Sequence, residues 1–288
     1  MKEPSEKQLK EYEIFLTENE RAEATIRKYT RDVSLFFSYM KEKPIDKSAV
    51  MAYKRVLAGK YAPASLNTVI CALNGFFEFC GRHDLCLKNV RIQRRIFEET
   101  DRELTKSDYE KLLQAAARRN ERLFLLMQTI ASTGMRVSEL KFITVDAIDR
   151  EYADVNNKGK RRRIWLPRDL CRMLREYCRK QRRWRGSVFV TRYGNPLDRS
   201  NIWDELKRLC DFAHVYRKKV FPHNLRHLFA RTYYSARHDI VRLADLLGHS
   251  SVETTRIYTM ESGVVHRRQI QDLGLLQSPN PMEKNTTP

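Results

Sequence analysis

The chain has 288 residues, enough for two domains of ordinary size, and its 55 lysines and arginines against 36 acidic residues give a formal net charge of +19. So large a positive excess favours a polyanionic partner, with nucleic acid ahead of an anionic membrane surface, because the sequence has no apolar run of 18 residues. The six cysteines form no C-x-x-C pair, which argues against a zinc site, and their apolar surroundings favour buried, reduced thiols. The polar N-terminal residues are not a signal peptide, so we expect a cytoplasmic protein without a membrane partner.

The N-terminal part is predicted to be entirely helical. Over residues 5–90, apolar residues recur at steps of three and four, which is the period of a helix with one buried face. Asp46 is placed to cap one of these helices, and Gly81 to end the last one. We therefore predict an all-helical N-terminal domain over 1–90, followed by a densely charged linker over 91–101.

A second domain is predicted over residues 102–277, and most of it is also helical. Capping boxes, which fix helix starts, are expected at Thr105 with Asp108 and at Ser250 with Glu253. The expected helices are 121–132, 168–183, 198–213, 222–235, 239–247, 251–258 and 264–273. Residues 278–288 are expected to be a disordered tail.

The segment from 142 to 167 interrupts this helical pattern. It consists of short apolar pieces, with Asn156 and Asn157 as a turn signal and a strand expected at 162–166. We predict a small antiparallel sheet whose turn holds Lys158, Gly159 and Lys160. The fold class is therefore mainly α, with a small antiparallel β-sheet in the C-terminal domain.

The stretch from 222 to 260 carries the side chains that most suggest chemistry. His223 and Arg226 stand three apart, so on a helix they share one face. Arginine offers a planar fork of donors that suits phosphate oxygens, and histidine can handle a proton near neutral pH. Tyr258 follows His249 by nine residues, and a tyrosine hydroxyl can become a covalent nucleophile. Together these residues suggest attack on a phosphodiester, with Tyr258 becoming attached to the substrate.

Together with Arg136 and Lys158, these residues resemble the signature of the tyrosine recombinases of the Xer and phage-integrase superfamily. The resemblance rests on TGMRVSEL (133–140), KGK (158–160), HNLRHLFA (223–230) and LLGHSSVETTRIYT (246–259). Each piece alone is a weak signal, but their order and the spacing to the tyrosine are specific. The resemblance implies that 1–90 is a SAM-like core-binding domain that contacts DNA, and that 102–277 is the catalytic domain.

The resemblance also implies roles in cutting one DNA strand. Tyr258 attacks the scissile phosphate and leaves a 3′-phosphotyrosine and a free 5′-hydroxyl, without metal, cofactor or ATP. Arg136 and Arg226 stabilise the charge that develops on the phosphate. His223 assists proton transfer at Tyr258 or holds the phosphate, and His249 hydrogen-bonds a non-bridging oxygen.

Further roles fall to the basic run after residue 157 and to one carboxylate. By resemblance Lys158 protonates the leaving 5′-oxygen, but Lys160 remains an alternative within the same run. Glu139, one helical step from Arg136, would orient the site from behind, whereas His227 reads as a structural residue. The candidate contacts to the DNA backbone are Lys160, Arg161, Arg217, Lys218 and Lys219.

The resemblance implies an assembly of four protomers on two sites in double-stranded DNA, exchanging strands through a four-way junction. The helix at 264–273 would dock on a neighbouring protomer, a second recombinase or an accessory protein could take part, and the protein would be associated with the nucleoid. Two alternatives are open: a type IB topoisomerase, which uses related chemistry as a monomer, and a DNA-binding protein that does not cut. The LLGH pattern favours the recombinase over the first, and the intact set of six residues argues against the second.

Overall fold

The computed structural model describes residues 7–41, 43–92, 102–157, 160–249, 251–258 and 271–272. The chain divides into two compact units, Met1–Arg95 and Ile96–Pro288, which are described one at a time. Most of the predicted linker and the predicted tail lie outside the described residues, so the finer domain boundaries stay a prediction.

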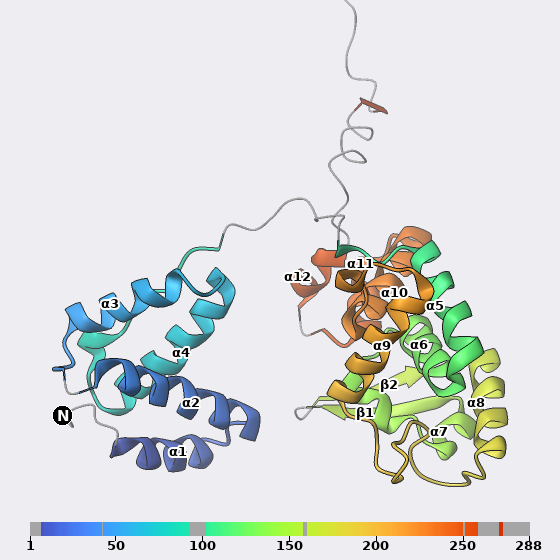
Figure 1. Cartoon of the computed structure of the whole chain (residues 1–288), viewed down its shortest axis with the longest axis horizontal. Coiled ribbons are helices and arrows are strands. Elements are labelled where there is room, and N and C mark those ends of the chain that lie inside the picture. Colours follow the sequence, from blue (N-terminus) through green and yellow to red (C-terminus); the bar gives the residue numbers. More distant parts are fainter. Residues whose placement is uncertain are drawn as a thin grey trace, which may run out of the picture. The chain divides into compact units, whose positions relative to one another are not determined.

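The described part of the first unit is built of helices alone (Figure 1). They are α1 (Gln8–Glu18), α2 (Glu23–Met40), α3 (Lys47–Ala58), α4 (Pro63–Phe79) and the short 3-10 helix η1 (His83–Leu85). The core is aromatic, with Phe36, Phe76 and Phe77 fully buried, and Phe36 meets Phe77 edge to face with ring centroids 5.6 Å apart. Such rings bury a large apolar area, which is what a small helical unit needs for its stability.

Two of its helix ends agree with the sequence. The Asp46 carboxylate accepts a hydrogen bond from the Ala49 N–H at 2.7 Å and so caps α3. Gly81 follows α4 with φ of +73°, the left-handed conformation in which glycine commonly ends a helix.

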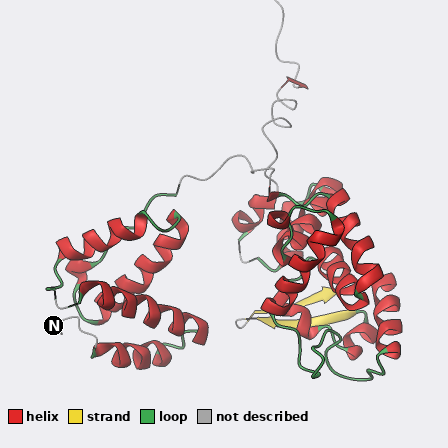
Figure 2. Cartoon of the chain, in the orientation of Figure 1, coloured by secondary structure: helices red, strands yellow, loops and turns green. Residues whose placement is uncertain are grey.

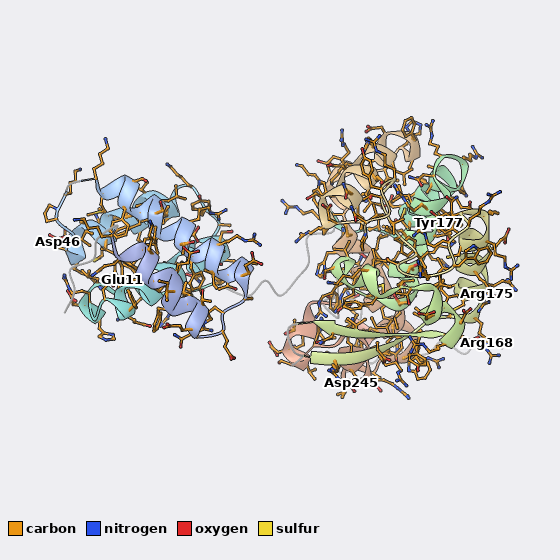
Figure 3. The ribbon with its side chains drawn as sticks, turned by 90° about the horizontal axis from the view of Figure 1, so that it is seen from below. Glu11, Asp46, Arg168, Arg175, Tyr177 and Asp245 are labelled. Carbon is orange, nitrogen blue, oxygen red and sulfur yellow. The ribbon has the colours of Figure 1, made fainter. Side chains whose placement is uncertain are left out.

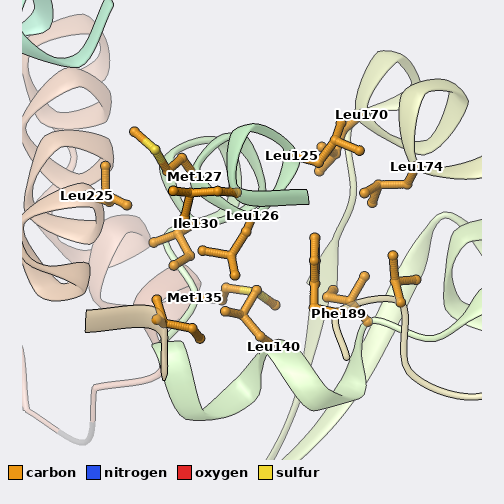
Figure 4. Packing of buried hydrophobic residues seen from close by; sticks show 14 of the residues in the cluster. Leu125, Leu126, Met127, Ile130, Met135, Leu140, Leu170, Leu174, Phe189 and Leu225 are labelled. Carbon is orange, nitrogen blue, oxygen red and sulfur yellow. The ribbon is translucent and has the colours of Figure 1, made fainter. Parts of the chain in front are cut away.

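The second unit combines its helices with a two-stranded hairpin that lies at one side of the unit (Figures 1 and 2). Its elements are α5 (Lys106–Arg119), α6 (Glu121–Thr133), η3 (Val137–Phe142), α7 (Val145–Arg150), β1 (Tyr152–Asn157), β2 (Lys160–Trp165), α8 (Arg168–Lys180), α9 (Arg199–Ala213), η4 (Arg217–Lys219), α10 (Pro222–Arg237), α11 (Ile240–Leu247), α12 (Val252–Thr255) and η5 (Arg256–Tyr258). Helix α6 packs against α5, α8 and α10. Its apolar residues, among them Leu126 and Ile130, face Met135 and Leu140 of the following segment in the core (Figure 4).

The hairpin has a defined register. Strands β1 and β2 are antiparallel, with Tyr152 opposite Trp165 and Asn157 opposite Lys160. Ala153, Val155 and Ile164 are buried, so one face of the hairpin lies on the core and the residues between them point outward. The predicted class, mainly α with a small antiparallel sheet, is confirmed.

Three local predictions need correction. Asn156 and Asn157 belong to β1 rather than to the turn, because both pair with β2. Helix α12 is capped by Ser251 and not by Ser250: the Ser251 hydroxyl accepts from the Glu253 N–H. Cys71 is exposed, although the other five cysteines are buried or partly buried and all six are free, as predicted.

Basic side chains of α8 form ion pairs with acidic residues of the same unit. Lys180, the last residue of α8, pairs with Glu121 at 3.0 Å and with Glu176 at 3.2 Å. Arg168 and Arg175 project from the same helix at the edge of the unit (Figure 3) and pair with Glu151 and Asp149. These pairs are exposed, so each contributes little to stability.

Candidate active site

The site forms where three parts of the second unit meet: the segment after α6, the N-terminal half of α10, and the segment from α11 to Tyr258. The first part depends on Gly134, which ends α6 with φ of +64°. Its position leaves no room for a side chain, since an added Cβ would lie 2.3 Å from a ring carbon of Phe229 on α10. This close approach brings the Gly134 carbonyl to Arg226.

Arg226 is the centre of the site and is only 1% exposed. Its Nη1 donates to the Gly134 carbonyl at 2.6 Å, and its Nη2 donates to the Leu247 carbonyl at 2.7 Å. Burial first, and then the charge of Arg136, lower the pKa of the Arg226 guanidinium to about 10. The partners are neutral dipoles that orient the guanidinium without cancelling its charge, which suits the binding of an anion.

Arg136 directly precedes η3 and is held by a carboxylate. Glu139, which is 1% exposed, accepts from the Arg136 backbone N–H at 2.7 Å and from its Nη1 at 3.2 Å. The Arg136 Nη2 lies 3.4 Å from the Gly248 carbonyl, which it reaches across the site. About a third of the Arg136 side chain remains exposed, so this guanidinium is accessible to a ligand.

His249 is held in one tautomer. Its Nε2 lies 2.9 Å from Nη2 of Arg226, and because a guanidinium can only donate, Nε2 must be the acceptor. The ring proton is therefore on Nδ1, which donates to the buried Thr255 hydroxyl at 2.8 Å. Burial and the neighbouring charge of Arg226 lower the pKa of His249 to about 4, which agrees with a neutral ring.

Tyr258 lies 3% exposed at the edge of a small apolar cluster with Ala230, Leu243 and Leu247. Its side chain forms a hydrogen bond with Arg226. Its ring is nearly parallel to that of His249, at an interplanar angle of 14° and a centroid separation of 5.8 Å. The tyrosine is thus in contact with both the arginine and the histidine that the sequence placed in the same site.

Two further histidines line this end of α10. His227 lies edge-on to Tyr258, with centroids 4.6 Å apart, and edge-on to His223 at 4.7 Å. Burial, and after it the neighbouring His223, lower the pKa of His227 to about 3. His223 is more exposed than His227. Its remaining burial, and after it the charge of Arg226, still lower the pKa of His223 below its ordinary value. Both rings are therefore neutral at physiological pH.

Comparison with known proteins assigns the chain to a family. The phage integrase family matches residues 102–263, and the N-terminal SAM-like domain of phage integrases matches residues 9–83. The chain belongs to the phage integrase family. Tyrosine recombinase XerA of Thermococcus kodakarensis is 30% identical to this family member over 283 residues, covering 94% of this chain and 96% of the relative.

Solved structures of recombinases are similar as well. The crystal structure of XerA recombinase is 25% identical, with a TM-score of 0.53, and covers 94% of this chain and 99% of that chain. XerH site-specific recombinase, bound to difH substrate in a pre-cleavage complex, has a TM-score of 0.68 at 22% identity and covers 93% and 85% of the two chains. This phage integrase family member is a tyrosine-type site-specific recombinase, and its relatives favour neither a topoisomerase nor a DNA-binding protein that does not cut.

Not every candidate residue lies in the described site. Lys158 lies outside the described residues, as does most of the helix expected at 264–273, and of Lys160 only the backbone, at the start of β2, is described. Arg161, Arg217 and Lys218 are exposed, as a backbone contact requires. Lys219 is partly buried, and its ammonium is paired with Asp108 at 3.1 Å, which reduces the charge it can offer to DNA.

Sequence reasoning missed three members of the site. Arg162 was grouped with a basic run but binds Glu139, and the alternation of β2 could have indicated that it shares the inward face of Ile164. His227 follows His223 by one helical turn, which is a detectable signal. Nothing in the sequence indicated that the Thr255 hydroxyl would accept a hydrogen bond from His249.

No cluster of metal-ligating side chains occurs among the residues that the structure describes. Within the same residues, no helix is long and apolar enough to cross a membrane.

Proposed function

We propose that this recombinase cuts and rejoins duplex DNA through a 3′-phosphotyrosine at Tyr258, and that it exchanges strands between two DNA sites through a four-way junction. The observation that carries the proposal is the position of Tyr258. Its side chain is hydrogen-bonded to Arg226, and its ring stacks on that of His249. A hydroxyl nucleophile beside a buried cation with neutral partners is what attack on a phosphodiester requires.

In the cleavage step, the Tyr258 oxygen forms a bond to phosphorus while the bond from phosphorus to the 5′-oxygen breaks. The tyrosine hydroxyl loses a proton and the 5′-oxygen gains one, so the diester keeps its single negative charge. Because the new linkage is also a phosphodiester, rejoining is the same step in reverse and consumes no nucleotide. His223, neutral near pH 7, assists the transfer of the Tyr258 proton or holds the phosphate.

Arg226 and Arg136 form the clamp for the phosphate. Arg226 is hydrogen-bonded to the Tyr258 side chain, so a phosphate that meets the tyrosine oxygen also lies beside this guanidinium. His249 now accepts a hydrogen bond from Arg226 through Nε2. A bound phosphate adds negative charge, raises the pKa of His249, and so allows Nε2 to donate to a non-bridging oxygen.

Lys158 is the proposed donor of the proton to the 5′-oxygen, with Lys160 as the alternative. Its support is the hairpin register, in which Lys160 pairs with Asn157 at the start of β2, and the sequence, in which Lys158 directly follows Asn157. Glu139 orients Arg136 by accepting two hydrogen bonds from it. Exposed basic residues outside the site, including Arg161, Arg217 and Lys218, contact the DNA backbone.

The partner in this proposal is double-stranded DNA, held by four protomers on two sites. Its support is the charge of +19 and the likeness to a recombinase bound to its DNA substrate. The segment at 264–273 docks on a neighbouring protomer, and the protein works on the nucleoid in the cytoplasm. A second recombinase or accessory protein is compatible with this arrangement.

The test uses nicked suicide duplexes drawn from DNA that flanks the gene, incubated with the protein without metal or nucleotide. The expected product is a covalent protein–DNA band on a denaturing gel with the wild type and none with Tyr258→Phe. The matched control is Tyr193→Phe, an exposed tyrosine of the second unit, which should keep the band. An adduct at full yield with Tyr258→Phe would overturn the proposal.

A further inference from the structure

Arg162 joins two parts of the site that are far apart in the sequence. From β2, its Nη2 donates to the Glu139 carboxylate at 2.7 Å, and its Nη1 donates to the carbonyl of Leu246 near the end of α11. The side chain is 15% exposed, and the carboxylate that it binds is 1% exposed. One guanidinium therefore connects the hairpin, the segment of Arg136 and the segment that leads into His249.

The packing around this guanidinium leaves little freedom. An added Cβ on Gly248, whose φ is +64°, would lie 2.4 Å from Cδ and 2.7 Å from Nε of Arg162. Residue 248 can therefore carry no side chain while Arg162 holds its present position. The next arginine on the strand behaves differently: Arg163 points outward, pairs with the exposed Asp154, and lies over the ring of Tyr152.

We propose that Arg162 is a positioning residue that holds strand β2, and with it the lysine that donates the proton, against the phosphate clamp. The inference rests on the proposed function, since that function assigns Lys158 or Lys160 to the leaving 5′-oxygen. Arg162 stands two residues after Lys160 on β2, and its backbone pairs with Val155 of β1. The hydrogen bond from Arg162 to Glu139 therefore sets where β2, with Lys160 at its start, lies relative to Arg136.

The loss of Arg162 should affect one half of the reaction more than the other. Glu139 would keep both hydrogen bonds to Arg136, and Arg226 would keep its carbonyl partners, so the clamp remains. Strand β2 would lose its hydrogen bonds to Glu139 and Leu246, and the proton donor would be misplaced. The defect should therefore lie in protonation of the leaving oxygen and not in stabilisation of charge on the phosphate.

The experiment compares two suicide substrates that differ in one atom. The first has the natural 5′-oxygen at the scissile bond, and the second has a 5′-bridging sulfur, which leaves as a thiolate and needs no proton. Single-turnover cleavage is measured for Arg162→Met, which keeps the length of the side chain, and for Arg162→Lys. Arg163→Met, on the opposite face of the same strand, is the matched control.

We expect Arg162→Met to cleave the oxygen substrate about 100-fold more slowly than the wild type, the usual effect of a misplacement of about 1 Å. On the sulfur substrate its rate should return to within about threefold of the wild type, because a positioned general acid, which contributes about 10²–10⁴-fold, is no longer needed. Arg162→Lys should recover part of the oxygen rate, and Arg163→Met should cleave both substrates normally.

Equal slowing of Arg162→Met on both substrates would overturn the inference, because a merely structural defect does not depend on the leaving group. The variants Lys158→Ala and Lys160→Ala identify the donor in the same assay, since of the two lysines only the donor should be rescued by sulfur when it is lost. The proposed function is judged separately: a wild-type adduct that Tyr258→Phe lacks supports it whatever Arg162 does, and Tyr258→Phe forming the adduct sinks it.

Discussion

Replacement of Gly134 by alanine tests how the end of α6 supports Arg226. At φ of +64°, a residue with a Cβ is strained, which costs about 1–2 kcal/mol. The new methyl group would also lie 2.3 Å from a ring carbon of Phe229 and 3.0 Å from a methyl group of Leu247. Overfilling such a packed contact costs about 1–3 kcal/mol, so Gly134→Ala should lower the free energy of unfolding by about 2–5 kcal/mol.

Gly194→Ala is the matched control. Gly194 also has a positive φ, +84°, but an added Cβ would meet nothing within 4 Å. Its substitution should therefore cost only the backbone strain, about 1–2 kcal/mol. The difference between the two variants isolates the contact with Phe229 and Leu247.

The assay is urea unfolding followed by tryptophan fluorescence. The three tryptophans, Trp165, Trp184 and Trp203, all belong to the second unit, so the signal reports on that unit alone. With an unchanged dependence on urea, a shift in the midpoint gives the change in stability. Equal destabilisation by Gly134→Ala and Gly194→Ala would refute the reasoning. Since the Gly134 carbonyl accepts from Arg226, we also expect slower suicide cleavage by Gly134→Ala only.

Three other predictions concern pH, salt and the C-terminal segment. The pKa values of His227 and His249, about 3 and about 4, are below the ordinary 6.5, so the unfolded chain takes up protons first and stability falls as pH drops below about 6.5. By pH 5 the free energy of unfolding of the second unit should fall by about 1–2 kcal/mol per histidine, and by less in His227→Gln. A urea midpoint that stays unchanged from pH 8 to 5 would contradict this. DNA affinity should fall steeply with salt because of the charge of +19, whereas a flat affinity between low and physiological salt would exclude a phosphate-dominated interface. Deleting residues 264–288 should preserve DNA binding but impair strand exchange, and full exchange by the truncated protein would reject a coupling role for that segment.

The local features of this protein can be predicted from its sequence because they depend on residues close together in the chain. The caps at Asp46 and at Thr105 with Asp108 involve partners three residues apart, and both occur as expected. The helices of both units follow from the recurrence of apolar residues, which is a property of each segment alone. The resemblance to a family supplied the candidate site, because the order and spacing of its motifs are also properties of the sequence.

The remaining features depend on contacts across long stretches of chain. Alternation along β2 indicates that Arg162 points inward, but only the packed structure brings it to Glu139, 23 residues earlier, and to Leu246, 84 residues later. In the same way, the sequence indicates that Lys219 is a cation free to contact DNA. Only the fold brings it to Asp108, 111 residues away, with which it pairs. The sequence by itself determined which side chains this protein has for its chemistry and which helices carry most of them. Tertiary structure decided which charges are paired, which are left for a phosphate, and which proton His249 holds, because these depend on distances that local patterns do not encode.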